Sequence, residues 1–170
     1  RMLGVARDVT ARKLAETRLA QSESSFRTVI EASPDAIAVH VGGKVVYANA
    51  ALARLLGYAS AAEIVGRDVL SAVHPDDVAA VVERIRAMQR GEPWVPFAEE
   101  RLVRNDGVVV PCEIGAMLVS FQGEPAVVAM IRNLTARKRM LAQLAQADRL
   151  AAAGALAASV AHEINNPLTY

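Results

Sequence analysis

The amino-acid sequence predicts an α+β domain, a five-stranded antiparallel sheet with helices on one face, flanked by an N-terminal helix and a long C-terminal helix of coiled-coil type. Strand-like apolar runs form two groups, a pair within residues 36–48 and three more within residues 97–133. Between the groups, apolar residues recur at helical spacing and Gly and Pro interrupt the pattern. Short turns rich in Gly, Asn and Asp join the runs of each group, which favours antiparallel pairing.

The composition is that of one ordinary globular domain with helical extensions. The chain has 170 residues, a formal net charge of +1 and 53% hydrophobic residues. Lys and Arg are scattered, so nothing indicates a nucleic-acid partner. Cys112 is the one cysteine, which excludes an intrachain disulfide framework and fits a reducing compartment.

No apolar run approaches the roughly 18 residues of a membrane span, and there is no secretory signal. We therefore expect a cytoplasmic location for this segment, and a membrane anchor upstream of it is left open. The chain begins with Arg1 and ends at Tyr170, shortly after a proline-containing motif. We expect it to be a fragment of a longer protein.

The first helix is predicted over residues 11–32, and Ser33-Pro34-Asp35 ends it. Its early part is polar apart from a weak seam that could pair with a second copy of the chain. The seam consists of Ala15, Leu19, Ser22, Phe26 and Val29. Strands at 36–41 and 44–48 follow, joined by a tight turn at Gly42-Gly43.

The helical middle of the domain begins with residues 49–57, closed by a glycine, and a further short turn of helix at 60–64. A longer helix starts at His74-Pro75-Asp76-Asp77, where a proline and two acids suit a helix N-terminus, and runs to Arg90. Its apolar face is predicted to contain Val78, Val81, Val82, Ile85 and Met88.

Three strands close the domain, over residues 97–104, 108–121 and 125–133. Trp94, which stands between Pro93 and Pro96, is expected in the loop before the first of them.

Residues 5–13 resemble residues 130–138, about 125 residues further on, which is a domain-sized period. Each copy ends a β-prone run and then begins a polar helical pattern after a threonine. Residues 1–10 are therefore expected to end an upstream copy of the same domain.

The last helix is predicted from Thr135 to Asn166 and carries an apolar stripe toward its end. The stripe consists of Leu150, Ala153, Ala157, Val160, Ile164 and Leu168. His162 lies about 200° round the helix from Val160 and so points away from the stripe. Glu163 is its neighbour and Asn166 lies one turn on. A neutral imidazole nitrogen can attack a phosphoryl group while a carboxylate holds the proton of the other nitrogen. A lone exposed histidine on a helix usually has no such role, so the neighbours decide between the two interpretations.

The string His162-Glu163-Ile164-Asn165-Asn166-Pro167-Leu168 resembles the phosphoacceptor box of sensor histidine kinases, as does the lead-in over residues 148–157. The resemblance implies that His162 takes phosphate from ATP and passes it to an aspartate of a response regulator. It implies an acid/base role for Glu163 and a role for Asn166 in positioning water for the reverse, phosphatase reaction. Pro167 would bend or end the helix beside the histidine.

The region from about residue 22 to residue 135 resembles the PAS domain. The resemblance rests on Ser33-Pro34-Asp35-Ala36-Ile37, Val46-Tyr47-Ala48-Asn49, Leu56-Gly57-Tyr58, Val65-Gly66-Arg67, His74-Pro75-Asp76-Asp77 and Arg132-Asn133-Leu134-Thr135. Asn133 departs from the family, which usually has aspartate there, whereas Asp8 of the upstream copy keeps it. A charged contact at this junction is therefore in doubt.

PAS domains include binders of haem, flavin and metabolites as well as simple dimerisation modules, so the resemblance does not name a ligand. Cys112 lies in a late strand and does not suit a flavin–cysteine photocycle. His74 is interpreted as a helix-entry residue, and His40 ends a strand and could face either way. With few aromatic residues, a planar cofactor has little to stack on. No metal site is expected. The domain is expected to hold no tightly bound ligand, and a small apolar or carboxylate ligand is left open as the alternative, with Tyr47, Arg67 and Arg101 as candidates for its polar contacts.

Together, these features predict the sensory and dimerising segment of a two-component histidine kinase, which relays a signal from the PAS domain to His162. The expected divisions are an upstream PAS end at 1–10, a signalling helix at 11–25, the PAS domain at 26–134, a coiled-coil connector at 135–149 and a truncated phosphoacceptor helix at 150–170. The sequence has no Gly-rich phosphate loop, so ATP and Mg²⁺ belong to an ATP-binding domain that this segment lacks, and the segment alone is expected to be inactive. Expected partners are a second copy of the chain, that ATP-binding domain and a response-regulator receiver domain. The alternative is a PAS ligand-binding or dimerisation module with no catalytic role of its own.

The connector has an irregular apolar seam. Leu134, Leu141 and Leu144 begin it, but regular alternation would next place Asp148 inside. One hypothesis is that the helix has two registers, which the PAS domain selects between. The other is that Asp148 simply lies on a solvated face.

Overall fold

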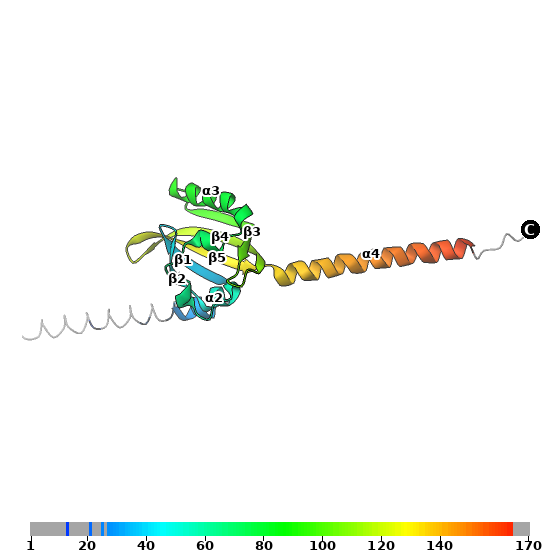
Figure 1. The fold of residues 1–170 in the computed structure, drawn as a ribbon, viewed down its shortest axis with the longest axis horizontal. Helices are drawn as coiled ribbons and strands as arrows, with labels where there is room; N and C mark the ends of the chain where they lie inside the picture. Colours follow the sequence, from blue (N-terminus) through cyan, green and yellow to red (C-terminus); the bar gives the residue numbers. More distant parts are fainter. Residues whose placement is uncertain (1–12, 14–20, 22–24, 26, 165–170) are drawn as a thin grey trace, which may run out of the picture. The chain divides into compact units, whose positions relative to one another are not determined.

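The computed structural model describes residues 13, 21, 25 and 27–164, with side chains as far as Gly154 (Figure 1). The chain divides into two compact units, one ending at Asn133 and one beginning at Leu134. The first unit contains the sheet and the short helices. The second contains the long helix.

The sheet has five antiparallel strands in the order β2-β1-β5-β4-β3. The strands are β1 (Ala36–Val41), β2 (Lys44–Ala48), β3 (Trp94–Val103), β4 (Val109–Phe121) and β5 (Glu124–Asn133). Pairing of β1 with β5 joins the early pair of strands to the late group of three. The predicted α+β fold with a five-stranded antiparallel sheet is confirmed, and the coiled-coil character of the flanking helices stays a prediction.

The turn between β1 and β2 explains why both strands have the predicted bounds. Gly42 and Gly43 have φ angles of 55° and 82°. Two successive positive φ values are the requirement of a type I′ turn, which glycine meets without steric cost. The turn therefore fixes where each strand ends.

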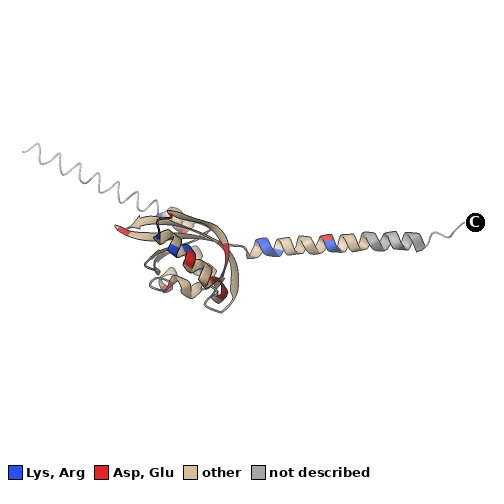
Figure 2. Ribbon diagram, turned by 90° about the horizontal axis from the view of Figure 1, so that it is seen from above, with Lys and Arg blue, Asp and Glu red and all other residues tan. Residues whose placement is uncertain are grey.

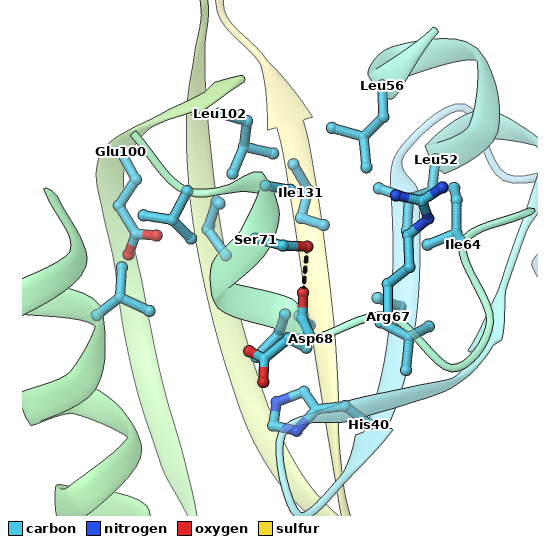
Figure 3. Close-up of a pocket in the computed structure, with 18 of the residues that line it drawn as sticks. His40, Leu52, Leu56, Ile64, Arg67, Asp68, Ser71, Glu100, Leu102 and Ile131 are labelled. Carbon is cyan, nitrogen blue, oxygen red and sulfur yellow. Dashed lines mark hydrogen bonds between the residues drawn. The ribbon is translucent and has the colours of Figure 1, made fainter. Parts of the chain in front are cut away.

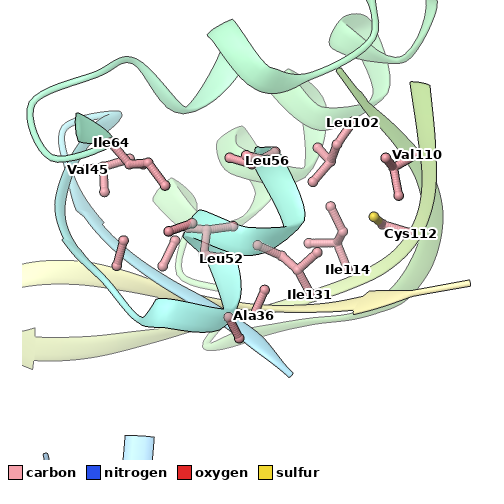
Figure 4. Packing of buried hydrophobic residues seen from close by; sticks show 14 of the residues in the cluster. Ala36, Val45, Leu52, Leu56, Ile64, Leu102, Val110, Cys112, Ile114 and Ile131 are labelled. Atoms are coloured by element: carbon pink, nitrogen blue, oxygen red, sulfur yellow. The ribbon is translucent and has the colours of Figure 1, made fainter. Parts of the chain in front are cut away.

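The short helices pack against one face of the sheet through a shared core. They are α2 (Ala50–Leu56), η1 (Ala61–Glu63), η2 (Val69–Ala72), η3 (Pro75–Asp77) and α3 (Val78–Gln89), and residues 27–32 are helical as well. Figure 4 shows Leu52 and Leu56 of α2 over Ile114 and Ile131 of the sheet. Cys112 of β4 belongs to this core and has no exposed surface.

The helical middle is more broken than the sequence indicates. The predicted turn at 60–64 is a single 3₁₀ turn, and the helix predicted from His74 begins with the 3₁₀ turn η3 before α3. His74 is the helix-entry residue expected, since its Nδ1 accepts from the amide of Asp76 at 3.3 Å. The 3₁₀ helix η2, capped by the Asp68 side chain, was not predicted.

The expectation that Trp94 lies in a loop is wrong. Trp94 is the first residue of β3, where it pairs with Met117, and 60% of its surface is exposed. The strand therefore begins three residues before the predicted start. Pro96 sits at an irregularity in the pairing between Val95 and Ala98, where a missing amide donor is tolerated.

The Asn49 side chain joins the helical turn before β1, strand β1 and helix α2 through hydrogen bonds. Its side chain has no exposed surface and makes four hydrogen bonds. The Oδ1 atom accepts from the amides of Ile37 and Leu52, each at 3.0 Å. The Nδ2 atom donates to the carbonyls of Ile30 at 3.0 Å and Asp35 at 3.1 Å. One buried amide thus caps α2 and holds a preceding helical turn against β1.

The second unit is the helix α4 (Thr135–Ile164). Figure 2 shows a basic segment at its beginning, where Arg137, Lys138 and Arg139 follow one another in the sequence. Leu141, Leu144, Asp148 and Leu150 are all exposed within this unit. Among the helices of the described residues, none has the length and apolar character needed to span a bilayer.

Candidate functional site

A cavity of about 320 Å³ lies within the first unit, bordered by the sheet and the helical segments α2, η2 and α3 (Figure 3). Most of its lining is aliphatic. The apolar lining residues include Val45, Leu52, Leu56, Ile64, Val81, Ile85, Met88, Leu102, Ile114 and Ile131. A mainly apolar cavity of this size with a few polar groups has the general form of a small-molecule site.

His40 supplies one of these polar groups. It comes from β1, just after a register shift in the pairing with β2, and only 7% of its surface is exposed. Its Nδ1 atom is buried and has no hydrogen-bond partner among the described residues. Burial lowers the pKa of His40, and the nearby Asp68 carboxylate opposes this only in part. Figure 3 shows the imidazole beside Asp68 at one end of the cavity. The imidazole is therefore neutral near pH 7.

Glu100 and Arg84 form an ion pair at the opposite wall. Glu100 of β3 is only 7% exposed. Arg84 of α3 also donates from Nη2 to the carbonyls of Pro96 at 3.1 Å and Ile114 at 2.8 Å. Burial lowers the pKa of Arg84. The guanidinium is thus committed to protein groups and ties α3 to the sheet.

Arg67, one of the three residues nominated for polar contacts, lies in the cavity wall. Its Nε donates to the carbonyl of Glu63 at 2.6 Å, and its guanidinium lies over the Tyr58 ring, 4.8 Å from the centroid. Arg67 is exposed, so it stands at the rim with much of its side chain in solvent.

The other two nominated residues, Tyr47 and Arg101, do not line this cavity. The Tyr47 hydroxyl donates to Glu31 at 2.6 Å, and burial together with this bond raises its pKa to about 12. Arg101 donates to both carboxylate oxygens of Asp77, at 3.0 and 2.7 Å. The structure therefore brings only Arg67 of the three to the cavity.

Most of the polar residues at the cavity do not follow from the sequence. The sequence leaves the orientation of His40 open, and Arg84, Asp68 and Glu100 are not among the residues it predicts for a site. A signal existed for Glu100, because it shares the inward parity of Leu102 in β3 and stands opposite Cys112 in β4. A carboxylate at an inward position of a strand needs a partner, and a nearby arginine on a covering helix is the usual one.

The predicted phosphoacceptor residues fall at the end of α4. His162 and Glu163 are in helical conformation, as predicted. Their side chains lie outside the part of the chain whose side chains are described, and Asn166 and Pro167 lie outside the described residues altogether. The chemistry assigned to these four residues stays a prediction.

Comparison with known proteins identifies the fold family of the chain and its sequence relatives. A family model described as a PAS domain matches residues 24–89. The crystal structure of the PAS domain of an HTR-like protein from Haloarcula marismortui superposes with a TM-score of 0.58 at 25% identity, covering 71% of this chain and 98% of that domain.

Two curated relatives are signalling proteins. The chain is 33% identical to sporulation kinase A of Bacillus subtilis (strain 168), over 95% of this chain and 27% of that protein. It is 30% identical to the C4-dicarboxylate transport sensor protein DctS of Rhodobacter capsulatus, over 98% of this chain and 27% of that protein. The chain thus spans about a quarter of the length of these relatives.

Proposed function

The chain carries a PAS domain and is related in sequence to sensor histidine kinases, and from this premise we propose that it is the sensory and dimerising segment of a two-component kinase. In this proposal the PAS domain receives the signal and His162 receives the phosphate. A cytoplasmic response regulator is the final acceptor. The observation that carries the proposal is the sequence of the box from His162 to Leu168. Its first residues belong to helix α4, which one residue separates from the last strand of the PAS domain.

The chemistry at His162 is nucleophilic transfer in two steps. A neutral ring nitrogen forms a bond to the γ-phosphorus of ATP as the bond to the bridging oxygen of ADP breaks, and Glu163 stabilises or takes the proton on the other ring nitrogen. A carboxylate oxygen of the regulator aspartate then bonds to phosphorus and the nitrogen–phosphorus bond breaks. ATP and Mg²⁺ are supplied by a separate ATP-binding domain. In the reverse, phosphatase direction, Asn166 orients the attacking water.

The connection between the two units supports a relay. Strand β5 ends at Asn133 and helix α4 begins at Thr135, so a single residue separates them. A change in the position of β5 is therefore expected to be passed to the start of α4, because no flexible linker separates them. The exposed side chains of Leu141 and Leu144 in α4 support pairing of this helix with a second copy, because an isolated helix cannot bury its apolar residues alone.

The test uses a chimera in which Tyr170 is followed by the remaining, ATP-binding part of sporulation kinase A. We expect label from γ-labelled ATP on the chimera, in an acid-labile and alkali-stable linkage as a phosphorylated histidine requires. His162→Gln should abolish the label. The matched control is His74→Gln, which changes another of the three histidines and should retain it.

Label that persists in His162→Gln would overturn the assignment of the phosphoacceptor. A chimera that folds and binds ATP but never labels this segment would support the alternative, a PAS binding or dimerisation module without a catalytic role.

A further inference from the structure

We propose that the PAS cavity binds a small, uncharged, mainly apolar molecule whose single hydroxyl group hydrogen-bonds to Nδ1 of His40. The inference rests on the proposed sensory role of the domain, for which it names the ligand class. Its test measures binding alone, so its outcome is independent of phosphotransfer to His162.

The size of the cavity limits the ligand. A volume of about 320 Å³ corresponds to about ten water molecules at the ~30 Å³ that each occupies in the liquid. An organic molecule on the order of ten non-hydrogen atoms fits this space. Most of the wall offers aliphatic side chains, so most of the ligand must be apolar as well.

His40 defines the polar end of the ligand. Its Nδ1 atom is buried without a hydrogen bond to any described residue, and leaving such a group unpaired is unfavourable. A neutral imidazole nitrogen is either a donor or an acceptor, according to which nitrogen carries the proton. A hydroxyl group matches both forms, because it donates one hydrogen bond and accepts others. A ketone or an ether matches only one.

The charges around the cavity disfavour an anionic ligand. A carboxylate placed beside His40 would lose its water without gaining an unengaged cation, because Lys44 is paired with Asp68 and Arg84 with Glu100. The cations are already engaged: Arg84 with Glu100 and two carbonyls, and Arg104 with Asp106 at 3.1 Å. Arg67 is at the solvent-exposed rim. The carboxylate ligand left open by the sequence therefore does not fit the buried end.

A cationic ligand is disfavoured for a related reason. The Glu100 carboxylate is already neutralised by Arg84, and Asp68 is paired with Lys44 at 3.5 Å and accepts from the amide of Leu70 at 3.0 Å. An ammonium group would lose its water without gaining an unpaired carboxylate. An uncharged hydroxyl avoids that loss.

The test compares 1-hexanol, hexanoate and 1-hexylamine, which share a chain length and differ in the head group. The whole chain, labelled with ¹⁵N, is titrated with each compound and followed by its amide resonances and by the ring-nitrogen resonances of His40. We expect saturable binding of hexanol at residues lining the cavity, with a shift of the His40 ring nitrogens. Hexanoate and hexylamine should bind at least tenfold more weakly.

His40→Phe keeps a ring of similar size and removes the hydrogen bond, and it should weaken hexanol binding about tenfold. His74→Asn is the control, because it changes a histidine outside the cavity and retains a side chain suited to cap η3. The proposal is overturned if hexanoate or hexylamine binds as tightly as hexanol, or if no probe shifts the cavity resonances. Unchanged His40 ring resonances in the wild-type chain would overturn it even where the phenylalanine variant does not fold.

Discussion

Replacing Arg84 with methionine should destabilise the PAS domain far more than replacing Arg86, which lies on the same helix. Arg84→Met leaves the Glu100 carboxylate, 7% exposed, without its ion-pair partner. It also removes the donor to the carbonyls of Pro96 and Ile114. Arg86 is 64% exposed in its side chain, and its ion pair is with the similarly exposed Glu83, at 3.6 Å.

The magnitude follows from the burial of the pair. Removing one partner of a buried ion pair costs about 3–5 kcal/mol, because the remaining charge is desolvated and unpaired. The Arg84 side chain is 21% exposed, so water reaches the site in part, and the lower limit of about 3 kcal/mol applies. For Arg86→Met the loss should be about 0.5 kcal/mol or less, as for other exposed pairs.

The assay is urea unfolding, followed by fluorescence of Trp94 in β3 and by circular dichroism. With a denaturant dependence of about 1.5 kcal/mol per molar urea, Arg84→Met should lower the midpoint by about 2 M. The double variant Arg84→Met/Glu100→Leu removes both charges and should recover at least about 1 kcal/mol of that loss. Equal midpoints for the two arginine variants, or no recovery in the double variant, would refute the assigned role of the buried pair.

Three further outcomes are expected. Asn49→Ala should cost about 3 kcal/mol or more in urea unfolding, because four hydrogen bonds to a fully buried amide are lost; a loss below about 1 kcal/mol would contradict its role in joining β1 and α2. Hydrogen bonds from the Arg101 side chain and backbone amide hold the pKa of Asp77 at about 2. The stabilisation is therefore present above about pH 4 and is lost as pH falls through 2. Asp77→Asn should be less stable than the wild type by about 1 kcal/mol at pH 6, and this difference should disappear as pH falls below 2. Asp148→Leu should lock one register of α4, so phosphorylation of His162 in a signal-responsive kinase should lose its response; a response that persists would favour the solvated-face interpretation of Asp148.

The bounds of most strands could be predicted to within about one residue because glycines in the sequence mark the turns between them. Gly42 and Gly43 fix the first hairpin, and Gly107 and Gly123 have the positive φ values, 81° and 84°, expected of the turns around β4. The beginning of β3 could not be predicted in this way. Pro93 and Pro96 both indicate a loop, and only the pairing of Trp94 with Met117 shows that the strand passes through them.

The cavity could not be predicted because the sequence does not reveal which side of a strand faces inward. Strand β1 has apolar residues at nearly every position, so alternation gives no sign of the direction of His40. Tyr47 and Arg101 were nominated for their chemistry, and each has a carboxylate partner elsewhere in the fold. The phosphoacceptor box, in contrast, is a local string and was visible without any knowledge of the fold.

The burial of Cys112 makes the reactivity of its thiol a measure of how often the core of the domain opens. The thiol has no exposed surface, and burial raises its pKa to about 12, so a thiol reagent in solution meets neither an accessible sulfur nor a thiolate. The thiol is therefore modified only when the core opens, and the rate of modification measures how often this opening occurs. Since Cys112 is the one cysteine in the sequence, this rate can be measured on the wild-type chain without an engineered label. A molecule bound in the cavity lowers the rate of Cys112 modification in proportion to its occupancy. The rate can therefore be used to search compound collections for the natural signal.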